Sequence, residues 1–261
     1  MVRMEDLDTP RVQPGPADAI LKALEEFGLA WDGPVLYQSS RTGAYREAFE
    51  DLKNRNLVYP CGCTRREVAD SIVGPGGGVH EYEPRYTGVC RDGLRRGRTP
   101  RSWRVRVPPA PVLFEDRVQG RQEQNIEQYC GDFVVLRAYG LFAYQLAVVV
   151  DDREQGITDI VRGADLLDST PRQIYLQRLL GAPEPRYLHT PVAVDAGGQK
   201  LSKQTRAPAI EPSAAAATLI DALVFLGQKP LPGLSIHDVW KWAVANWDAS
   251  RIPQTLSACA P

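Results

Sequence analysis

Residues 142–152, with the sequence Phe-Ala-Tyr-Gln-Leu-Ala-Val-Val-Val-Asp-Asp, form an apolar run that ends in two carboxylates. A continuous, valine-rich run is typical of a parallel strand that is covered on both faces. In open α/β sheets, ligands bind beyond the carboxyl ends of such strands. We therefore predict a buried strand at residues 144–150 with a ligand site at its end, to which residues 160–165 add further charges.

The segments around this run alternate between helix and strand signals, which predicts an α/β fold. Apolar residues at helical spacing predict helices at 17–27 and 41–54 and after Asp165, and Thr64 with Glu67 forms a capping box for a helix that reaches Ile72. Strands are predicted at 1–4, 57–59, 103–107 and 133–137, with a tight turn at 139–140 and a flexible loop at 74–78, and residues 187–194 lead to the loop 197–204. Beyond Glu211 only helices are predicted, at 213–226 and 235–246, each with a serine at its start.

Composition places the chain among ordinary globular proteins. It has 261 residues, of which 43% are hydrophobic and 24% charged, which suits one domain with an inserted subdomain or two modest domains. No apolar run is long enough to cross a bilayer and the start has no signal-peptide pattern, so we expect a cytoplasmic protein without a membrane partner.

The net charge of −1 gives no overall attraction to RNA, so any RNA contact must use a local basic patch. The candidate lies before and within the strand predicted at 103–107, and a solvated loop is the alternative interpretation. Its members are Arg91, Arg95, Arg96, Arg98, Arg101, Arg104 and Arg106.

Three of the five cysteines, Cys61, Cys63 and Cys90, are clustered, which favours a metal site over a secreted disulfide framework. Thiolates are ligands that zinc prefers in closed, tetrahedral structural sites. A fourth ligand is needed, and on ligand chemistry alone His80 is favoured over a neutral phenol. Buried thiols without a metal are the alternative. Cys130 and Cys259 are expected to be plain thiols.

A second candidate site is the loop 197–204, with the sequence Gly-Gly-Gln-Lys-Leu-Ser-Lys-Gln. Glycines allow close approach of the backbone to a ligand, and lysine ammonium groups can follow a polyphosphate as its charge moves. The pattern therefore indicates a mobile phosphate clamp, with a solvated surface loop as the alternative.

Taken together, residues 142–165, the lysine loop and the amino-terminal segment 3–11 resemble the catalytic domain of glutamate-specific class I aminoacyl-tRNA synthetases, and more narrowly the short glutamyl-Q tRNA(Asp) synthetase family. The resemblance implies an incomplete class I Rossmann-type nucleotide-binding fold with an inserted zinc-containing subdomain and a short helical C-terminal end. The implied divisions are 1–60 and 113–210 for the catalytic domain, 61–112 for the zinc-binding acceptor subdomain, and 211–261 for the helical segment.

The resemblance also implies two-step aminoacylation, in which ATP with Mg²⁺ activates glutamate and the glutamyl group is then transferred to tRNA. Lys200, Ser202 and Lys203 match the family's Lys-Met-Ser-Lys-Ser motif as catalytic residues, with Lys203 on ATP, while Leu201 and Gln204 depart from its second and final positions. Cations where negative charge accumulates are what phosphoryl chemistry requires.

Glutamate recognition is implied at three residues. Glu5 matches the acidic group for the substrate ammonium, Tyr144 the aromatic hydroxyl beside it, and Arg162 the guanidinium that pairs with a substrate carboxylate. From the residues alone, Glu5 could equally lie on a solvated strand end, Tyr144 in the core, and Arg162 against a structural carboxylate. The family pattern Cys-x-Cys followed by Tyr-x-x-x-Cys makes Tyr86 the fourth ligand of one structural Zn²⁺ with Cys61, Cys63 and Cys90.

The two ends of the chain refine this expectation. After Lys203 there is room for only two or three helices, whereas ordinary glutamyl-tRNA synthetases carry a large anticodon-binding domain. The short family instead glutamylates queuosine, the modified first anticodon base of tRNA(Asp), and a monomer is expected. The family's Pro-x-Gly-x-Leu-His-x-Gly signature for ATP does not precede Glu5, and we expect a misplaced start codon rather than a true truncation. Charging of the tRNA 3′ end, or a non-catalytic zinc and RNA-binding remnant, are the alternative functions.

Overall fold

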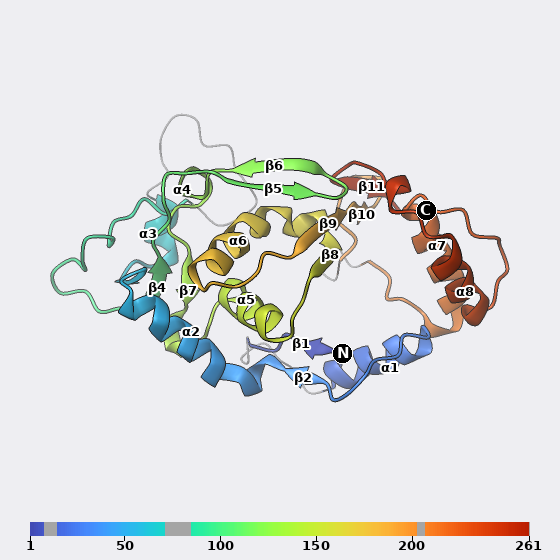
Figure 1. Ribbon diagram of the computed structural model, residues 1–261, viewed down its shortest axis with the longest axis horizontal. Coiled ribbons are helices and arrows are strands. Elements are labelled where there is room, and N and C mark those ends of the chain that lie inside the picture. The colour runs from blue at the N-terminus through green and yellow to red at the C-terminus, as the bar shows by residue number, and fades with distance from the viewer. Residues whose placement is uncertain (8–14, 71–84, 203–206, 261) are drawn as a thin grey trace.

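A computed structural model describes the chain at residues 1–7, 15–70, 85–202 and 207–260. Figure 1 places β4 (Ser102–Val105) and α3 (Arg65–Asp70) toward one end of the long axis, and α7 (Ala215–Phe225) and α8 (Ile236–Asn246) at the other. Strand β3 (Val58–Cys61) pairs with β4. Within the described part of the chain, no helix has both the length and the apolarity needed to cross a membrane.

The described strands form two larger sheets. One is antiparallel, with strand order β3-β4-β7, where β7 is Val134–Leu136. The other has strand order β6-β5-β9-β8, formed by Gly120–Gln124, Val112–Asp116, Arg186–Thr190 and Asp159–Gly163. Strands β5 and β6 form an antiparallel hairpin, whereas β9 is parallel to both β5 and β8.

Two short parallel pairs complete the described strands. Strand β1 (Arg3–Met4) pairs with β2 (Leu36–Tyr37), and β10 (Val192–Val194) pairs with β11 (Ser257–Cys259). The first confirms a strand at the amino terminus. The second contradicts the expectation of helices alone beyond Glu211, because the chain returns from α8 to add a strand beside β10.

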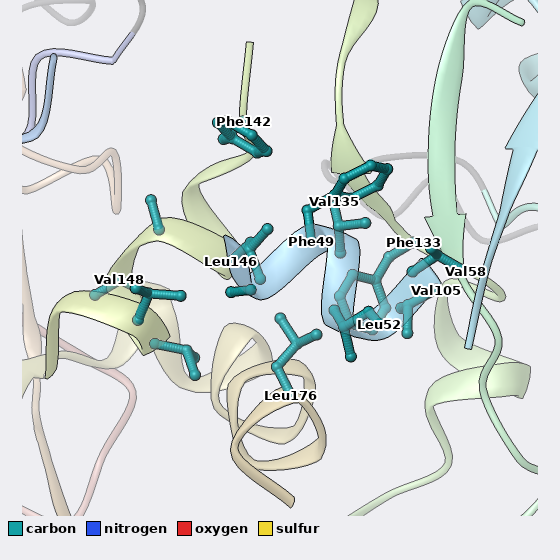
Figure 2. Close-up of a cluster of buried hydrophobic side chains, with 14 of the residues drawn as sticks. Phe49, Leu52, Val58, Val105, Phe133, Val135, Phe142, Leu146, Val148 and Leu176 are labelled. Carbon is teal, nitrogen blue, oxygen red and sulfur yellow. The ribbon is translucent and has the colours of Figure 1, made fainter. Parts of the chain in front are cut away.

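The helices before the C-terminal end are α1 (Pro16–Glu26), α2 (Thr42–Asn54), α4 (Ile126–Tyr129), α5 (Tyr144–Glu154) and α6 (Thr170–Leu179), with 3-10 turns at Gln38–Arg41, Ala138–Gly140, Ala164–Ser169, Pro212–Ala214 and Ala249–Arg251. Figure 2 shows the main core, where Leu52 of α2, Val105 of β4, Leu146 of α5 and Leu176 of α6 converge. All four side chains are fully buried. This core joins the two larger sheets and fixes α5 and α6 beside the site described below.

The run that we predicted as a strand at 144–150 is a helix, α5, so that prediction was wrong. Every residue from Leu146 to Asp152 is buried in α5, and a helix that is enclosed on all sides has the same unbroken apolar sequence as a covered parallel strand. The carboxylates of Asp151 and Asp152 consequently lie on the inner turns of a helix and not at the open end of a strand.

Several local predictions can be compared with the structure. The capping box is confirmed, since Thr64 N donates to Glu67 Oε2 at 2.7 Å and Glu67 N donates to Thr64 Oγ1 at 3.2 Å. The turn at Tyr139 is confirmed by its positive φ of 62°. Ser235 caps α8 as predicted, whereas Ser213 does not cap α7, whose capping position is Ala214. Ile72 and the glycine-rich loop 74–78 lie outside the described residues.

Candidate functional site

Arg162 is the second-to-last residue of β8, and its register partner on the parallel strand β9 is His189. Partners in register point to the same face of a sheet, and Arg162 Nε donates to His189 Nε2 at 3.0 Å. Arg162 Nη2 also donates to Thr170 Oγ1, at 2.7 Å. The described residues place no acceptor within hydrogen-bond distance of the Nη1 end, so this end of the guanidinium is available to a ligand.

Behind Arg162 lies a fully buried, hydrogen-bonded pair of side chains, Asp116 and His189. His189 Nδ1 is 2.6 Å from Asp116 Oδ2, and neither side chain is exposed. Asp116 Oδ1 accepts the backbone N–H groups of Val118, Gln119 and His189. Although burial alone raises the pKa of Asp116, the hydrogen bonds from His189 and from these backbone groups lower it to about 2.

Tyr144 interacts electrostatically with both Arg162 and Glu5. Tyr144 begins α5, and its pKa is raised, first by burial and then by the negative charge of Glu5, while Arg162 opposes the shift. The pKa of Glu5 is raised by burial, which outweighs the attraction of Arg3. Tyr144 is thus within electrostatic reach of the other two predicted glutamate-binding residues, Glu5 and Arg162.

The two carboxylates of α5 hold this neighbourhood in place. Asp152 accepts from Arg3 Nη1 at 2.8 Å, and Arg3 also reaches Glu5 Oε1 at 3.3 Å. Arg3 was not predicted as part of the site, and it ties Glu5 to α5. Asp151 is fully buried and accepts from Gln38 at 2.8 Å, Arg41 at 2.6 Å and Tyr45 at 2.8 Å. Its oxygens are saturated by the protein, so it is a structural group.

The lysine loop begins as a hairpin turn. The amides of Gly197 and Gln199 donate to Asp195 Oδ1, both at 2.9 Å, and the amide of Gly198 donates to the Asp195 carbonyl. These amides are therefore occupied, and the glycines serve the turn, where Gly198 has a φ of 78°.

After the turn, the backbone of Lys200 forms an antiparallel β-bridge with that of Val194. The ammonium group of Lys200 lies 2.5 Å from Asp165 Oδ2. Gly163 gives Asp165 the room for this contact, since a Cβ there would lie 2.5 Å from Asp165 Oδ1. Lys200 thus reaches the segment that follows Arg162. Ser202 is described and half-buried, whereas Lys203 lies outside the described residues.

The cysteine cluster lies between β3 and the loop that follows Tyr86. The sulfurs of Cys61, Cys63 and Cys90 are all within 4.8 Å of one another, and Cys63 and Cys90 are 3.7 Å apart. Two thiolates on one tetrahedral Zn²⁺ with Zn–S bonds of about 2.3 Å would be about 3.8 Å apart. These residues could therefore hold a metal ion. His80 lies outside the described residues.

The Tyr86 hydroxyl lies among these sulfurs. It is 3.4 Å from Cys61 Sγ and 4.0 Å from Cys63 Sγ, and it accepts the Cys90 N–H at 2.8 Å. The Tyr86 N–H donates to the Cys130 carbonyl, and Gly131 must be glycine here because a Cβ would lie 2.0 Å from the Tyr86 carbonyl oxygen. The backbone thereby fixes the phenol at the cluster.

Arg104 provides positive charge beside the cluster. Its guanidinium carbon lies 3.9 Å from the centre of the Tyr86 ring, and its Nε is 3.4 Å from Cys61 Sγ. Burial raises the pKa of Cys61, but hydrogen bonds from Tyr86, the Cys63 backbone and Arg104 reverse this and lower it. The pKa of Cys63 is raised to about 12 by burial and by its neighbouring sulfurs. A soft donor set with compensating charge fits a structural metal site.

The basic stretch divides into two groups. Arg91 pairs with Asp132 at 3.1 Å, Arg98 pairs with Glu67, and Arg104 and Arg106 lie over the rings of Tyr86 and Tyr59. By contrast, the side chains of Arg95, Arg96 and Arg101 are exposed and have no ion pair with any described residue. Only these three remain as candidates for contact with a phosphate backbone.

Comparison with known proteins identifies the class. The structure is similar to a solved glutamate-tRNA synthetase from Elizabethkingia anophelis, with a TM-score of 0.76 and 22% identity, over 98% of this chain and 60% of that one. The chain thus spans less than two thirds of the length of that synthetase. Residues 1–215 match the family described as tRNA synthetases class I (E and Q), catalytic domain. The fold is therefore the mixed α/β fold of class I synthetases.

Two relatives narrow the assignment. A protein of Aromatoleum aromaticum named Glutamyl-Q tRNA(Asp) synthetase is 52% identical over all of this chain and 82% of its own length. A protein of Dechloromonas aromatica with the same name is 54% identical over 97% of this chain and 84% of its own length. The chain belongs to the glutamyl-Q tRNA(Asp) synthetase family of class I enzymes, and it is a ligase-type synthetase.

Proposed function

We propose that the chain uses ATP to activate glutamate and transfers the glutamyl group to the queuosine base at the first anticodon position of tRNA(Asp). The observation that carries the proposal is that Tyr144 lies within electrostatic reach of both the Glu5 carboxylate and the Arg162 guanidinium. The names of the relatives supply the acceptor.

Charge complementarity supports glutamate as the substrate. The Nη1 end of Arg162, to which no described residue offers an acceptor, suits a substrate carboxylate, because a guanidinium presents a planar fork that a carboxylate can accept in a bidentate manner. Glu5 provides the opposite charge for the ammonium group. Tyr144, which interacts with both residues, then borders the substrate between its two charged ends.

We assign the phosphates of ATP to the lysine loop. Because Asp195 already occupies the amides of Gly197 and Gln199, the side chains must supply the attraction. Lys200, Ser202 and Lys203 are the proposed catalytic groups, with Lys203 on ATP and Mg²⁺ as the accompanying cation. Their role is to neutralise the charge that develops as pyrophosphate leaves.

We propose that Cys61, Cys63, Tyr86 and Cys90 hold one structural Zn²⁺ in a subdomain that spans 61–112. Bound zinc would fix β3 to the loop at 86–90, and three thiolates leave the metal little capacity to activate water. The divisions at 60, 112 and 210 stay predictions.

The remaining proposals concern partners. The exposed Arg95, Arg96 and Arg101 are proposed to contact the tRNA backbone, and a splayed anticodon loop offers unstacked bases for recognition. We propose a monomer that acts in the cytoplasm.

Transfer of labelled glutamate tests the function. We expect ATP-dependent labelling of tRNA(Asp) that contains queuosine, label that resists removal of the 3′-terminal nucleotides, and no labelling of tRNA(Asp) without queuosine. Label that is lost with the 3′ end would contradict the proposal and favour ordinary charging.

The Arg162 assignment has its own test. Arg162→Lys keeps the charge but loses the fork, so we expect glutamate affinity to fall by about tenfold or more, since hydrogen bonds to charged groups contribute about 1.5–3 kcal/mol. Titration calorimetry with glutamate measures the effect. Arg117→Lys, at an exposed position, is the control. Equal affinity in the two variants would contradict the assignment.

A further inference from the structure

The buried pair of Asp116 and His189 lies behind Arg162 and is not explained by the fold alone. Both side chains are completely enclosed, and burying charged or polar groups is costly unless their hydrogen bonds are complete. Asp116 accepts the three backbone N–H groups of the turn and of β9 through Oδ1, so its Oδ2 is directed to His189 Nδ1. This geometry determines which ring nitrogen carries the proton.

The protonation pattern follows from the partners. Arginine has only donors, so the Nε–H that points at His189 Nε2 requires a lone pair there. Asp116 is a carboxylate, so it requires a proton on Nδ1. A neutral ring protonated on Nδ1 satisfies Arg162 and Asp116, and its Nε2 lone pair can also accept from the Thr170 hydroxyl, which lies 3.2 Å away. The other tautomer would set the Nε2–H against the Nε–H of Arg162 and would leave the Nδ1 lone pair facing the Asp116 carboxylate.

We propose that Asp116 and His189 are positioning residues for substrate binding: Asp116 fixes the tautomer of His189, and the Nε2 lone pair of His189 then fixes the rotation of the Arg162 guanidinium so that its Nη1 end faces the substrate carboxylate. This inference rests on the proposed binding of glutamate at Arg162.

Two further contacts complete the orientation of Arg162. Thr170 Oγ1 accepts from Nη2, so the Nε and Nη2 edge is held at two points and the remaining fork is fixed. The ring of Tyr187 is stacked on His189 with centroids 6.2 Å apart, and the Arg162 guanidinium lies 5.7 Å from the Tyr187 centroid. These contacts restrain the plane of the guanidinium. A guanidinium that is already oriented loses less rotational freedom when the substrate binds. We therefore expect Asp116 and His189 to increase the affinity for glutamate.

The tautomer can be measured on the unmodified chain. The nitrogen-15 shifts of the histidine rings distinguish the two tautomers, and the chain has three histidines. His189→Gln identifies the resonances of His189 by their disappearance. We expect a neutral ring with the proton on Nδ1. A proton on Nε2 would overturn the proposal, and the tautomer itself is read on the unmodified chain.

Two substitutions separate positioning from packing. In His189→Asn the amide can still donate to Asp116 but leaves no acceptor near Arg162, whereas in His189→Gln the longer side chain can bring a carbonyl oxygen to Arg162. We expect His189→Asn to weaken glutamate binding by about tenfold or more, which is the contribution of a hydrogen bond to a charged group. The loss in His189→Gln should be smaller, because its carbonyl oxygen can replace the acceptor for Arg162. The ATP affinity should not change.

The control is His237→Asn, the same substitution at an exposed position on α8. Thr170→Val offers a milder probe of the same edge of Arg162 should the histidine variants fail to fold, and we expect a severalfold loss of glutamate affinity.

The outcomes distinguish this inference from the function on which it rests. Normal glutamate binding by folded His189→Asn, or equal losses in the Asn and Gln variants, would overturn the positioning role. If the unmodified chain shows the Nδ1 tautomer but binds no glutamate, the proposed function fails while the hydrogen-bonded arrangement stands.

Discussion

The cysteine cluster and the Arg162 site differ in how their polar groups are satisfied. At Arg162, each buried donor meets an acceptor within the protein, from Asp116 through His189 to the guanidinium, and one end is left for a ligand. At the cysteine cluster, the sulfurs mainly face one another, and Arg104 supplies the adjacent positive charge. The hydrogen bonds behind Arg162 are therefore complete without a ligand, whereas the sulfurs of the cysteine cluster form a set of metal donors that a cation would complete.

This difference predicts where each site is sensitive. Removing one group from the Arg162 arrangement leaves neighbouring partners unpaired, and the cost is that of one or two buried hydrogen bonds. Removing one sulfur from the cluster weakens binding of an ion that joins β3 to the loop at 86–90, and the cost is shared by the whole module. We therefore expect the larger losses of stability at the cysteines.

Cys90→Ser is the strongest test of this difference. Structural zinc contributes several kcal/mol to folding, and each kcal/mol shifts the unfolding midpoint of a chain of this size by about 2–4 °C. We expect loss of bound zinc and a fall of roughly 10 °C or more in that midpoint. Elemental analysis and thermal unfolding measure the two effects.

The matched control for this substitution is Cys259→Ser, because Cys259 is exposed and lies outside the cluster. It should keep both the metal content and the unfolding midpoint. Zinc retained by Cys90→Ser at the level of Cys259→Ser would show that Cys90 is not a ligand, and no zinc in either variant or in the unmodified chain would show that the cluster consists of plain buried thiols.

Tyr86→Phe separates a ligand from a hydrogen-bonding neighbour. The substitution keeps the ring beneath Arg104 but removes the oxygen that lies 3.4 Å from Cys61 Sγ. We expect zinc to remain bound with an affinity lowered about 10–100-fold, as is usual when a group that supports a metal site is lost. Competition with a chromophoric chelator gives the affinity.

Tyr59→Phe is the control for this experiment, since it removes a hydroxyl from the same small core. The Tyr59 hydroxyl donates to Asp132 and not to a sulfur. Unchanged zinc affinity in Tyr86→Phe would exclude the phenol as a ligand and return His80 to consideration.

The same comparison shows what could be predicted from the sequence. The cysteine cluster was predictable because its residues lie within thirty positions of one another and thiolate spacing is itself a signal. The pair of Asp116 and His189 was not, because the two residues are 73 positions apart and meet only through the order of β5, β9 and β8. A single histidine within a strand gives no sign of its partner.

The α5 segment shows a second limit of sequence analysis. Its unbroken run of apolar residues reports that the segment is enclosed, and this is equally true of a covered strand and of a central helix. The prediction of Tyr144 as a glutamate-binding residue does not depend on the secondary structure assigned to it, because it rests on the family motif, and it stays a prediction. The role of the two glycines in the lysine loop could not be foreseen either, since it depends on the side chain of Asp195 folding back onto the turn.

The acid stability of the Arg162 site is the next smaller effect. The pKa of Asp116 is held at about 2, below its ordinary value of 3.8. Because the pKa of Asp116 is lower in the folded state, its ionised carboxylate stabilises that state by about 2 kcal/mol above about pH 4. This stabilisation is lost as the pH falls toward 2. Denaturant unfolding between pH 5 and about 3 should show the decline, and Asp116→Asn should flatten it.

Asp159→Asn is the comparison for this measurement, because Asp159 also has a lowered pKa, through Arg186, but lies at the surface. We expect it to change the pH dependence little, since an exposed ion pair is screened by solvent. An equal slope in the unmodified chain and in Asp116→Asn would mean that the buried pair does not govern acid stability.

The smallest expected effect lies next to the cysteine cluster, at the capping box of α3. Thr64→Ala removes the oxygen that accepts the Glu67 N–H at 3.2 Å, and loss of such a cap costs about 1 kcal/mol. Because α3 directly follows Cys63, the substitution tests whether the helix helps to hold the cluster. Ser235→Ala removes the equivalent cap of α8, far along the sequence from either site. Equal small losses of stability with unchanged zinc affinity would mean that bound zinc fixes the module without help from the helix, whereas a zinc affinity lowered only by Thr64→Ala would mean that α3 preorganises the cluster.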